Sequence, residues 1–173
     1  YFNDLNITFK EDQNTHAEIN VEPFERGYAV TVGNALRRTL LTSLPGAAVT
    51  SIRFEGIPHE FSTIDGISED VADIILNFKK IRFSMDDNAT TELINLKLDI
   101  DKGELLAGEL DQHLTEFKVI NKKLKLATIN KKVSLDIEVR VSRGKGYVIA
   151  EKNKRSDDVL GTISIDSIFN PVL

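Results

Sequence analysis

The sequence has 173 residues, of which 41% are hydrophobic and 28% charged, which favours a globular protein of one or two domains over a disordered chain. The absence of cysteine excludes disulfides, thiolate metal sites and a cysteine nucleophile, and the net charge of -5 argues against a chain whose main task is to coat nucleic acid. No apolar run approaches the length of a membrane span.

The first 46 residues predict a hairpin followed by a helix. Short strand-like runs at 6–10 and 17–21 flank the polar segment Glu11–Asn14. Apolar residues then recur at three- and four-residue steps, on one face of a helix that ends at Pro45-Gly46: Val32, Ala35, Leu36, Leu40 and Leu44. Arg37, Arg38 and Leu41 fall on a different face. Periodicity alone leaves two interpretations open, a core helix with solvated arginines or a helix with two sets of contacts.

The middle of the chain predicts a strand at 48–54, a short extended piece at 59–63 and a helix at 68–80. Ser68 is the expected cap of this helix, and Glu69 and Asp70 lie in its first turn, where the helix dipole favours negative charge. The apolar face is formed by Val71, Ile74, Ile75 and Phe78. Lys79 and Lys80 stand at the C-terminal end, where positive charge is favoured.

Beyond residue 90 the hydrophobic period changes to two, which predicts antiparallel strands at 94–100 and 133–141. Further strands are predicted at 117–120, 124–126, 147–150 and 160–165, with a glycine-rich turn at 143–147 and a charged loop at 151–158. The fold class is therefore α+β. A final strand after a long excursion indicates that the middle block is inserted into a domain made by the two ends.

Catalytic chemistry has little support. The sequence lacks a Walker phosphate loop, a GxGxxG fingerprint and a GxSxG elbow. The histidines are isolated from one another, and His59 and Glu60, adjacent on an extended segment, would point to opposite faces. Acidic pairs such as Asp157-Asp158 are most simply read as solvated. We expect no catalytic residue and no metal site.

Two basic segments support an alternative function. Arg143–Tyr147 and Lys152–Arg155 have the composition of phosphate-contacting loops. A direct RNA- or DNA-binding module is therefore kept as the second hypothesis, against the simpler interpretation of a hairpin turn and a soluble loop.

Several long motifs, in order along nearly the whole chain, resemble the N-terminal domain of the bacterial RNA polymerase alpha subunit family. They are Glu22-Pro-Phe-Glu-Arg-Gly27, Thr31-Val-Gly-Asn-Ala-Leu-Arg-Arg-Thr-Leu-Leu41, Ser43-Leu-Pro-Gly46, Gly56-Ile-Pro-His-Glu-Phe-Ser-Thr63, Glu69–Lys79, Arg143–Val148 and Gly161–Pro171. The segment 102–115 departs from the family pattern.

The resemblance implies a dimerisation subdomain, residues 1–45 plus 159–173, interrupted by an inserted mainly-β subdomain with one helix, residues 46–158. It also implies that the chain is a fragment, because the family continues to a second helix that closes the dimer interface and to a C-terminal domain that binds promoter DNA and activators. Since the chain starts at Tyr1, we expect a trimmed N-terminus.

The resemblance also implies the partners and their contact residues. The second alpha subunit would pack on dimer or core positions, namely Tyr28, Val32, Ala35, Leu36 and Leu40. The beta subunit would contact Arg38 first, with Arg37 and Leu41 beside it. The beta-prime subunit would contact Lys79 and, in the turn at 143–147, Arg143 and Lys145.

The implied role is that of a non-catalytic scaffold in a DNA-directed RNA polymerase, a nucleotidyltransferase whose magnesium lies in another subunit. The chain itself would bind no cofactor and would contact DNA only indirectly, through the assembled polymerase. The expected location is the cytoplasm, where the assembled polymerase associates with the nucleoid, or alternatively a plastid.

Overall fold

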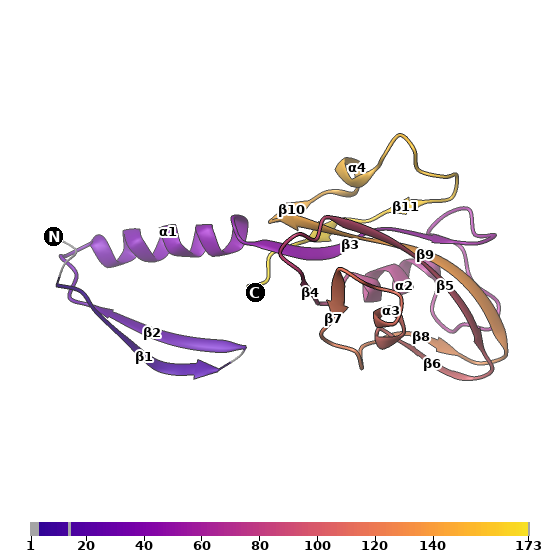
Figure 1. The fold of residues 1–173 in the computed structure, drawn as a ribbon, viewed down its shortest axis with the longest axis horizontal. Coiled ribbons are helices and arrows are strands. Elements are labelled where there is room, and N and C mark those ends of the chain that lie inside the picture. The colour runs from indigo at the N-terminus through magenta and orange to yellow at the C-terminus, as the bar shows by residue number, and fades with distance from the viewer. Residues whose placement is uncertain (1–3, 14, 173) are drawn as a thin grey trace. The chain divides into compact units, whose positions relative to one another are not determined.

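The computed structural model describes residues 4–13 and 15–172, and the chain forms two compact units, residues 1–40 and 41–173. Among the described residues the fold is mixed, with few helices and with strand pairs that are antiparallel (Figure 1). This agrees with the α+β prediction at the level of fold class. The predicted subdomain boundaries at residues 45 and 159 stay a prediction.

The first unit contains the predicted hairpin, formed by β1 (Asn6–Gln13) and β2 (His16–Glu22). Its strands are longer than predicted, because the ladder continues until Gln13 pairs with His16. Residues 11–13 therefore belong to β1 rather than to the turn. Asn14, also in the predicted turn, lies outside the described residues.

Helix α1 (Tyr28–Thr42) follows the hairpin and begins four residues before the apolar repeat of the sequence. The Tyr28 amide donates to the Glu25 carbonyl at 3.0 Å, which closes a turn ahead of the first helical residue. The helix ends before Pro45, as expected from the missing amide hydrogen of proline. None of its residues is buried.

The second unit is built on one antiparallel sheet, whose strand order is β11 (Ile163–Ser164), β3 (Pro45–Phe54), β9 (Val133–Lys145) and β5 (Thr91–Ile100). The period-two patterns fall on β5 and β9, which pair over ten residues. Their apolar positions face the core, where Leu96, Ile137 and Val139 are fully buried. The predicted strands are confirmed, and β9 extends four residues further than the pattern.

Helix α2 (Val71–Phe78) packs its apolar stripe into the same core, and all four residues of the predicted face are buried. Smaller elements complete the layer that lies beside α2 below the sheet in the view of Figure 1: β4 (Phe83–Met85) paired with β7 (Phe117–Val119), β6 (Gly103–Leu106) paired with β8 (Lys125–Ile129), and α3 (Gly108–Asp111). The sequence did not predict β4, β6 or α3.

The N-terminal cap of α2 differs from the prediction. Asp70 has extended backbone angles, and its carboxylate accepts a hydrogen bond from the Asp73 amide at 2.8 Å, so Asp70 is the cap. Ser68 instead accepts a hydrogen bond from the Asn130 side chain. Glu69, predicted in the first helical turn, binds the Thr128 amide and hydroxyl of β8. These contacts with distant residues hold 68–69 outside the helix.

Replacement of Asp70 by alanine is expected to destabilise the second unit by about 1 kcal/mol, because the amides of the first helical turn lose their side-chain acceptor. Chemical denaturation of the two alanine variants measures this. Ser68→Ala is the matched control, since it removes only an exposed hydrogen bond. A larger loss for Ser68→Ala than for Asp70→Ala would contradict the assignment of the cap.

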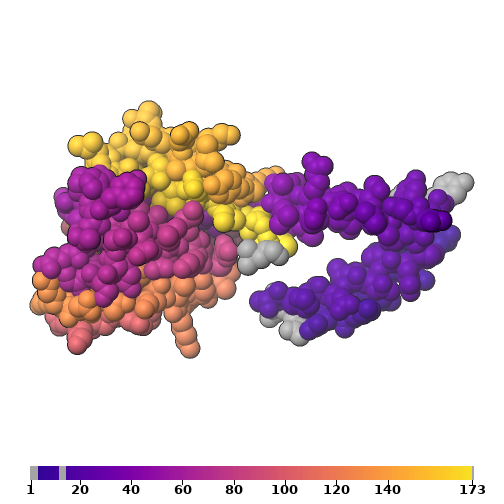
Figure 2. Space-filling view, turned by 180° about the vertical axis from the view of Figure 1, so that it is seen from behind, coloured from indigo at the N-terminus to yellow at the C-terminus, as the bar shows by residue number. Residues whose placement is uncertain are grey.

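The C-terminal segment consists of short elements of two to four residues each. Strand β10 (Tyr147–Val148) pairs with β12 (Ser167–Ile168), and α4 (Ala150–Asn153) lies between β10 and β11 in the chain. Figure 2 shows the C-terminal residues, in yellow, on the surface of this unit. The predicted strands at 147–150 and 160–165 are therefore each reduced to two residues, and the predicted loop 151–158 begins as a helical turn.

Two other local predictions were wrong. Residues 143–145 continue β9 rather than forming a turn, because β3 starts at Pro45 and provides partners as far as the Pro45–Lys145 pair. The chain turns at Gly146, whose φ is +60°. Residues 59–61 form a turn instead of an extended piece, with the Ser62 amide donating to the His59 carbonyl at 3.3 Å.

Candidate functional site

Helix α1 exposes the face that the apolar repeat defines. The exposed fractions are 53% for Tyr28, 56% for Leu36 and 41% for Leu40, and Val32 is only half-buried. Ala35 is also exposed. In the described chain these five residues therefore lie outside the hydrophobic core, and their assignment to a dimer interface stays a prediction.

Arg37, Arg38 and Leu41 form a second exposed face of α1. Arg37 and Leu41 are four residues apart and lie one turn from each other, with Arg38 beside them. Leu41 is 40% exposed, so this face offers an apolar side chain next to the two arginines. This combination of donors and apolar area is typical of the anchor residues of protein interfaces.

Lys79 lies where α2 meets the C-terminal segment. It is the C-cap residue of α2, and its ammonium group is 3.8 Å from Asp166. Asp166 also accepts hydrogen bonds from the Ala150 amide, at 2.7 Å, and from the Tyr147 hydroxyl. The hydrogen bond from the Ala150 amide holds the pKa of Asp166 below its ordinary value. The Asp166 carboxylate therefore joins Lys79 to Tyr147, the last residue of the predicted contact segment 143–147.

Arg143 and Lys145 stand on one face of β9, two residues apart, and both are exposed. Arg143 also donates a hydrogen bond to the backbone carbonyl of Asp87. Since β10 follows at Tyr147, Lys145 is two residues from the cluster of Lys79, Tyr147 and Asp166. The sequence alone does not indicate Asp166, because nothing near it in the chain marks it as the partner of a distant lysine.

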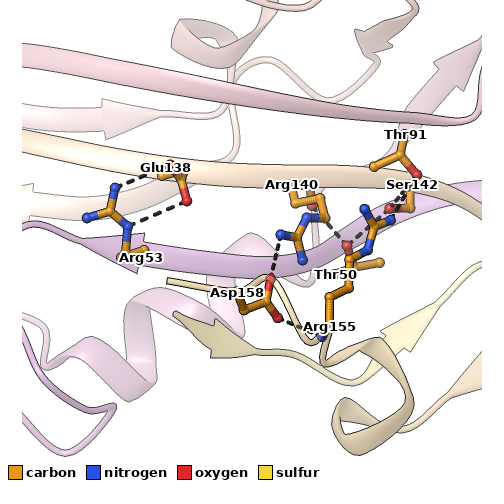
Figure 3. A network of polar contacts seen from close by, with 8 residues as sticks. All are labelled: Thr50, Arg53, Thr91, Glu138, Arg140, Ser142, Arg155 and Asp158. Carbon is orange, nitrogen blue, oxygen red and sulfur yellow. Dashed lines mark hydrogen bonds and ion pairs between the residues drawn. The ribbon is translucent and has the colours of Figure 1, made fainter. Parts of the chain in front are cut away.

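A second polar network crosses β3 and β9, and the sequence did not predict it (Figure 3). Arg140 and Asp158 form an ion pair at 2.6 Å, with side chains that are 9% and 7% exposed. The second oxygen of Asp158 accepts the Arg155 amide at 2.8 Å. Asp158 was expected to be solvated. This was wrong, because the loop after α4 folds back onto the sheet and buries its carboxylate against Arg140.

The residues weighed for catalysis do not assemble. His59 Nδ1 lies 3.3 Å from the Ser62 hydroxyl, but in the described part of the chain no hydrogen bond joins His59 to a carboxylate. Residues 4–13 and 15–172 contain no group of three metal-ligating side chains. No helix among them is long and apolar enough to cross a membrane. The candidates for a functional site among the described residues are the exposed faces of α1 and the Lys79 cluster.

Comparison with known families decides the kind of protein. Residues 52–170 match the family described as the RNA polymerase Rpb3/RpoA insert domain, which is more than half of the chain. The chain belongs to this family. The matched range contains α2, Lys79, β9 and Asp166, so the Lys79 cluster lies within the matched residues. Helix α1 lies before the match.

Relatives extend the similarity to α1 and the hairpin. Three similar proteins, each named DNA-directed RNA polymerase subunit alpha, come from Salinibacter ruber, Desulfitobacterium hafniense and Prosthecochloris aestuarii. They are 44%, 46% and 45% identical and cover 96%, 94% and 93% of this chain. The matched part is 50%, 51% and 50% of the relative. The chain therefore spans about half the length of the curated relatives it matches.

Proposed function

We propose that the chain is the N-terminal part of an alpha subunit of DNA-directed RNA polymerase, which pairs with a second alpha subunit and scaffolds the assembly of the beta and beta-prime subunits. The observation that carries the proposal is α1. It has an apolar face and an arginine-bearing face, and none of its residues is buried. The names of the relatives support the same role.

The apolar face of α1 favours a protein partner. Exposed leucine and tyrosine side chains in one contiguous patch gain stability by leaving water, and such patches mark interaction surfaces. The hairpin beside it in the chain is similar, since Ile7, Phe9 and Ile19 are each more than half exposed. In a pair of alpha subunits related by a two-fold axis, the same patch would meet its own copy.

The domain organisation follows from this role. Residues 1–45 and 159–173 would belong to the dimerisation subdomain, and residues 46–158 to the inserted subdomain. Tyr28, Val32, Ala35, Leu36 and Leu40 would face the second alpha subunit. Arg37, Arg38 and Leu41 would face beta.

The beta-prime contact is proposed at Lys79, Arg143 and Lys145. The Lys79 side chain is partly exposed, at 26%. Its ammonium group is 3.8 Å from Asp166, which is too long for a hydrogen bond, so its N–H groups can still bind a partner. Catalytic magnesium would be held by another subunit, and the complex would act on DNA in the cytoplasm.

Replacement of Arg38 by alanine is expected to leave the fold intact and to weaken capture of the beta subunit. A central interface arginine typically costs roughly 2 kcal/mol when truncated, which is roughly thirtyfold in affinity. The measurement mixes purified beta subunit with the complete gene product that contains this chain, carrying Arg38→Ala, and determines the dissociation constant.

Arg26→Ala is the matched control, because Arg26 is exposed just before α1 and belongs to none of the proposed contacts. It should bind beta with unchanged affinity. Wild-type affinity of Arg38→Ala, or an equal loss in both variants, would count against the assignment of this face to beta.

A further inference from the structure

The two basic segments of the sequence contribute to one pocket. A cavity of about 260 Å³ opens between the middle of β3 and the ends of β5 and β9 on one side and α4 with its following loop on the other. Arg143 reaches it from β9, and Lys152 and Arg155 reach it from α4 and the loop. Lys152 and Arg155, which follow Arg143 by 9 and 12 residues in the sequence, therefore share one space with it.

The charge of this pocket is one-sided. Its lining contains three cationic side chains and no carboxylate. Among the residues that the structure describes, none of the three cations lies within 4 Å of a carboxylate oxygen, whereas the nearby Arg140 is neutralised by Asp158. Three such cations in a chain of net charge -5 create a local positive potential that attracts an anion.

Hydroxyl groups line the sheet side of the pocket (Figure 3). Thr50 and Ser142 are 4% and 8% exposed, and their oxygens are 3.2 Å apart. Thr91 donates to Ser142 at 3.2 Å and accepts from the Arg155 guanidinium at 3.4 Å. This chain of hydrogen bonds holds the Arg155 guanidinium against the sheet and leaves most of its N–H groups available for a ligand.

We propose that this pocket binds a phosphate-bearing small molecule through its phosphate group. The guanidinium fork matches phosphate oxygens in a bidentate manner, and a lysine adds a point charge. The volume lies just below the usual range for pockets that enclose a whole drug-sized ligand, so it suits a phosphate or diphosphate group. A nucleic-acid strand fits less well, because the single aromatic lining residue, Phe169, is 4% exposed and offers no face for base stacking.

Inorganic pyrophosphate is the probe, titrated calorimetrically at 0.15 M salt into the complete gene product that contains this chain. The wild-type protein should bind one pyrophosphate. Arg155→Ala should bind it about tenfold more weakly or worse, because a hydrogen bond to a charged group is lost. The fold should persist, since the contact of Arg155 with Asp158 uses the backbone amide.

Lys154→Ala is the matched control. It removes one positive charge next to Arg155, yet Lys154 is exposed and does not line the pocket. Its affinity should change less than about twofold, because exposed charges are screened at this salt concentration. Absence of saturable binding, or equal weakening in both variants, would overturn the proposal. Binding of a single-stranded oligonucleotide that depends on Arg155, without binding of pyrophosphate, would overturn it in favour of a nucleic-acid strand.

Discussion

Replacement of Asp158 by asparagine is expected to destabilise the second unit by about 3 kcal/mol, because it leaves the Arg140 guanidinium buried without a counter-charge. The two side chains are almost fully excluded from water and meet at 2.6 Å. Arg140 Nη1 already lacks a hydrogen-bond partner in the described chain, so the guanidinium depends on Asp158 for compensation. Chemical denaturation, followed by circular dichroism, measures the change.

Two further variants separate the charge from the local backbone. Asp157→Asn changes the neighbouring carboxylate, which is exposed, and should alter stability by less than about 0.5 kcal/mol. Arg140→Met combined with Asp158→Leu removes both charges and should be more stable than Asp158→Asn alone, since an apolar pair can replace a buried ion pair. A double variant less stable than Asp158→Asn would contradict this account.

The same pair predicts how stability changes with pH. Burial disfavours the charged carboxylate, but hydrogen bonds from Arg140 and from the Arg155 amide outweigh it and lower the pKa of Asp158. A lowered folded-state pKa adds stability that is fully present above the unfolded value of about 3.9 and is lost as the pH falls through the folded value. The stability difference between wild type and Asp158→Asn should therefore be constant near neutral pH and shrink below about pH 4.

Elements with a strong internal pattern were predictable from the sequence. Helix α2 combines its apolar stripe with acidic residues at its N-terminal end, and β5 and β9 alternate along their length, so local preference and tertiary packing agree. Errors arose where a distant partner decides the outcome. Ser68 has the right chemistry for a cap, but β8 and Asn130 hold it outside the helix. The glycines at 144 and 146 suggest a turn, yet pairing with β3 extends β9 as far as Lys145.

The residues of the candidate sites also separate into those that a local pattern or motif indicates and those that depend on distant partners. Arg38 and Lys79 were proposed from motif resemblance, and local periodicity already separates the two faces of α1. Asp166 and the Arg140–Asp158 pair were not predictable, because each depends on a carboxylate of the C-terminal segment meeting a side chain of another element in the folded chain. Charge pairs are usually solvated. Only the folded arrangement shows which one is buried.

Replacement of Gly46 by alanine is expected to destabilise the second unit by about 3 kcal/mol, because the added methyl group would overlap the backbone of the C-terminal segment. An ideal Cβ on Gly46 would lie 2.9 Å from the carbonyl carbon of Phe169 and closer still to its oxygen. Gly46 pairs with Gly144, and together they form a slot for Phe169, which is 4% exposed. Thermal unfolding of the variant measures the loss, and Gly33→Ala, with no atom near its Cβ, should not be destabilised.

A comparison with Gly144 tests whether the clash expected in Gly46→Ala is with the backbone of Phe169 rather than with its side chain. A Cβ on Gly144 would lie 2.7 Å from atoms of the Phe169 ring, so a smaller side chain at 169 relieves that clash. Phe169→Leu should therefore reduce stability less in the Gly144→Ala background than in the wild-type protein. It should not restore the stability lost in Gly46→Ala. Equal rescue of both glycine variants would contradict a backbone clash.

Because the amide of Phe169 donates to the Gly146 carbonyl at 2.8 Å, loss of the slot would also release β12 and the neighbouring Asp166 from Tyr147 and Lys79. Under the proposed function, in which Lys79 contacts beta-prime, Gly46→Ala should then weaken that binding as well as stability.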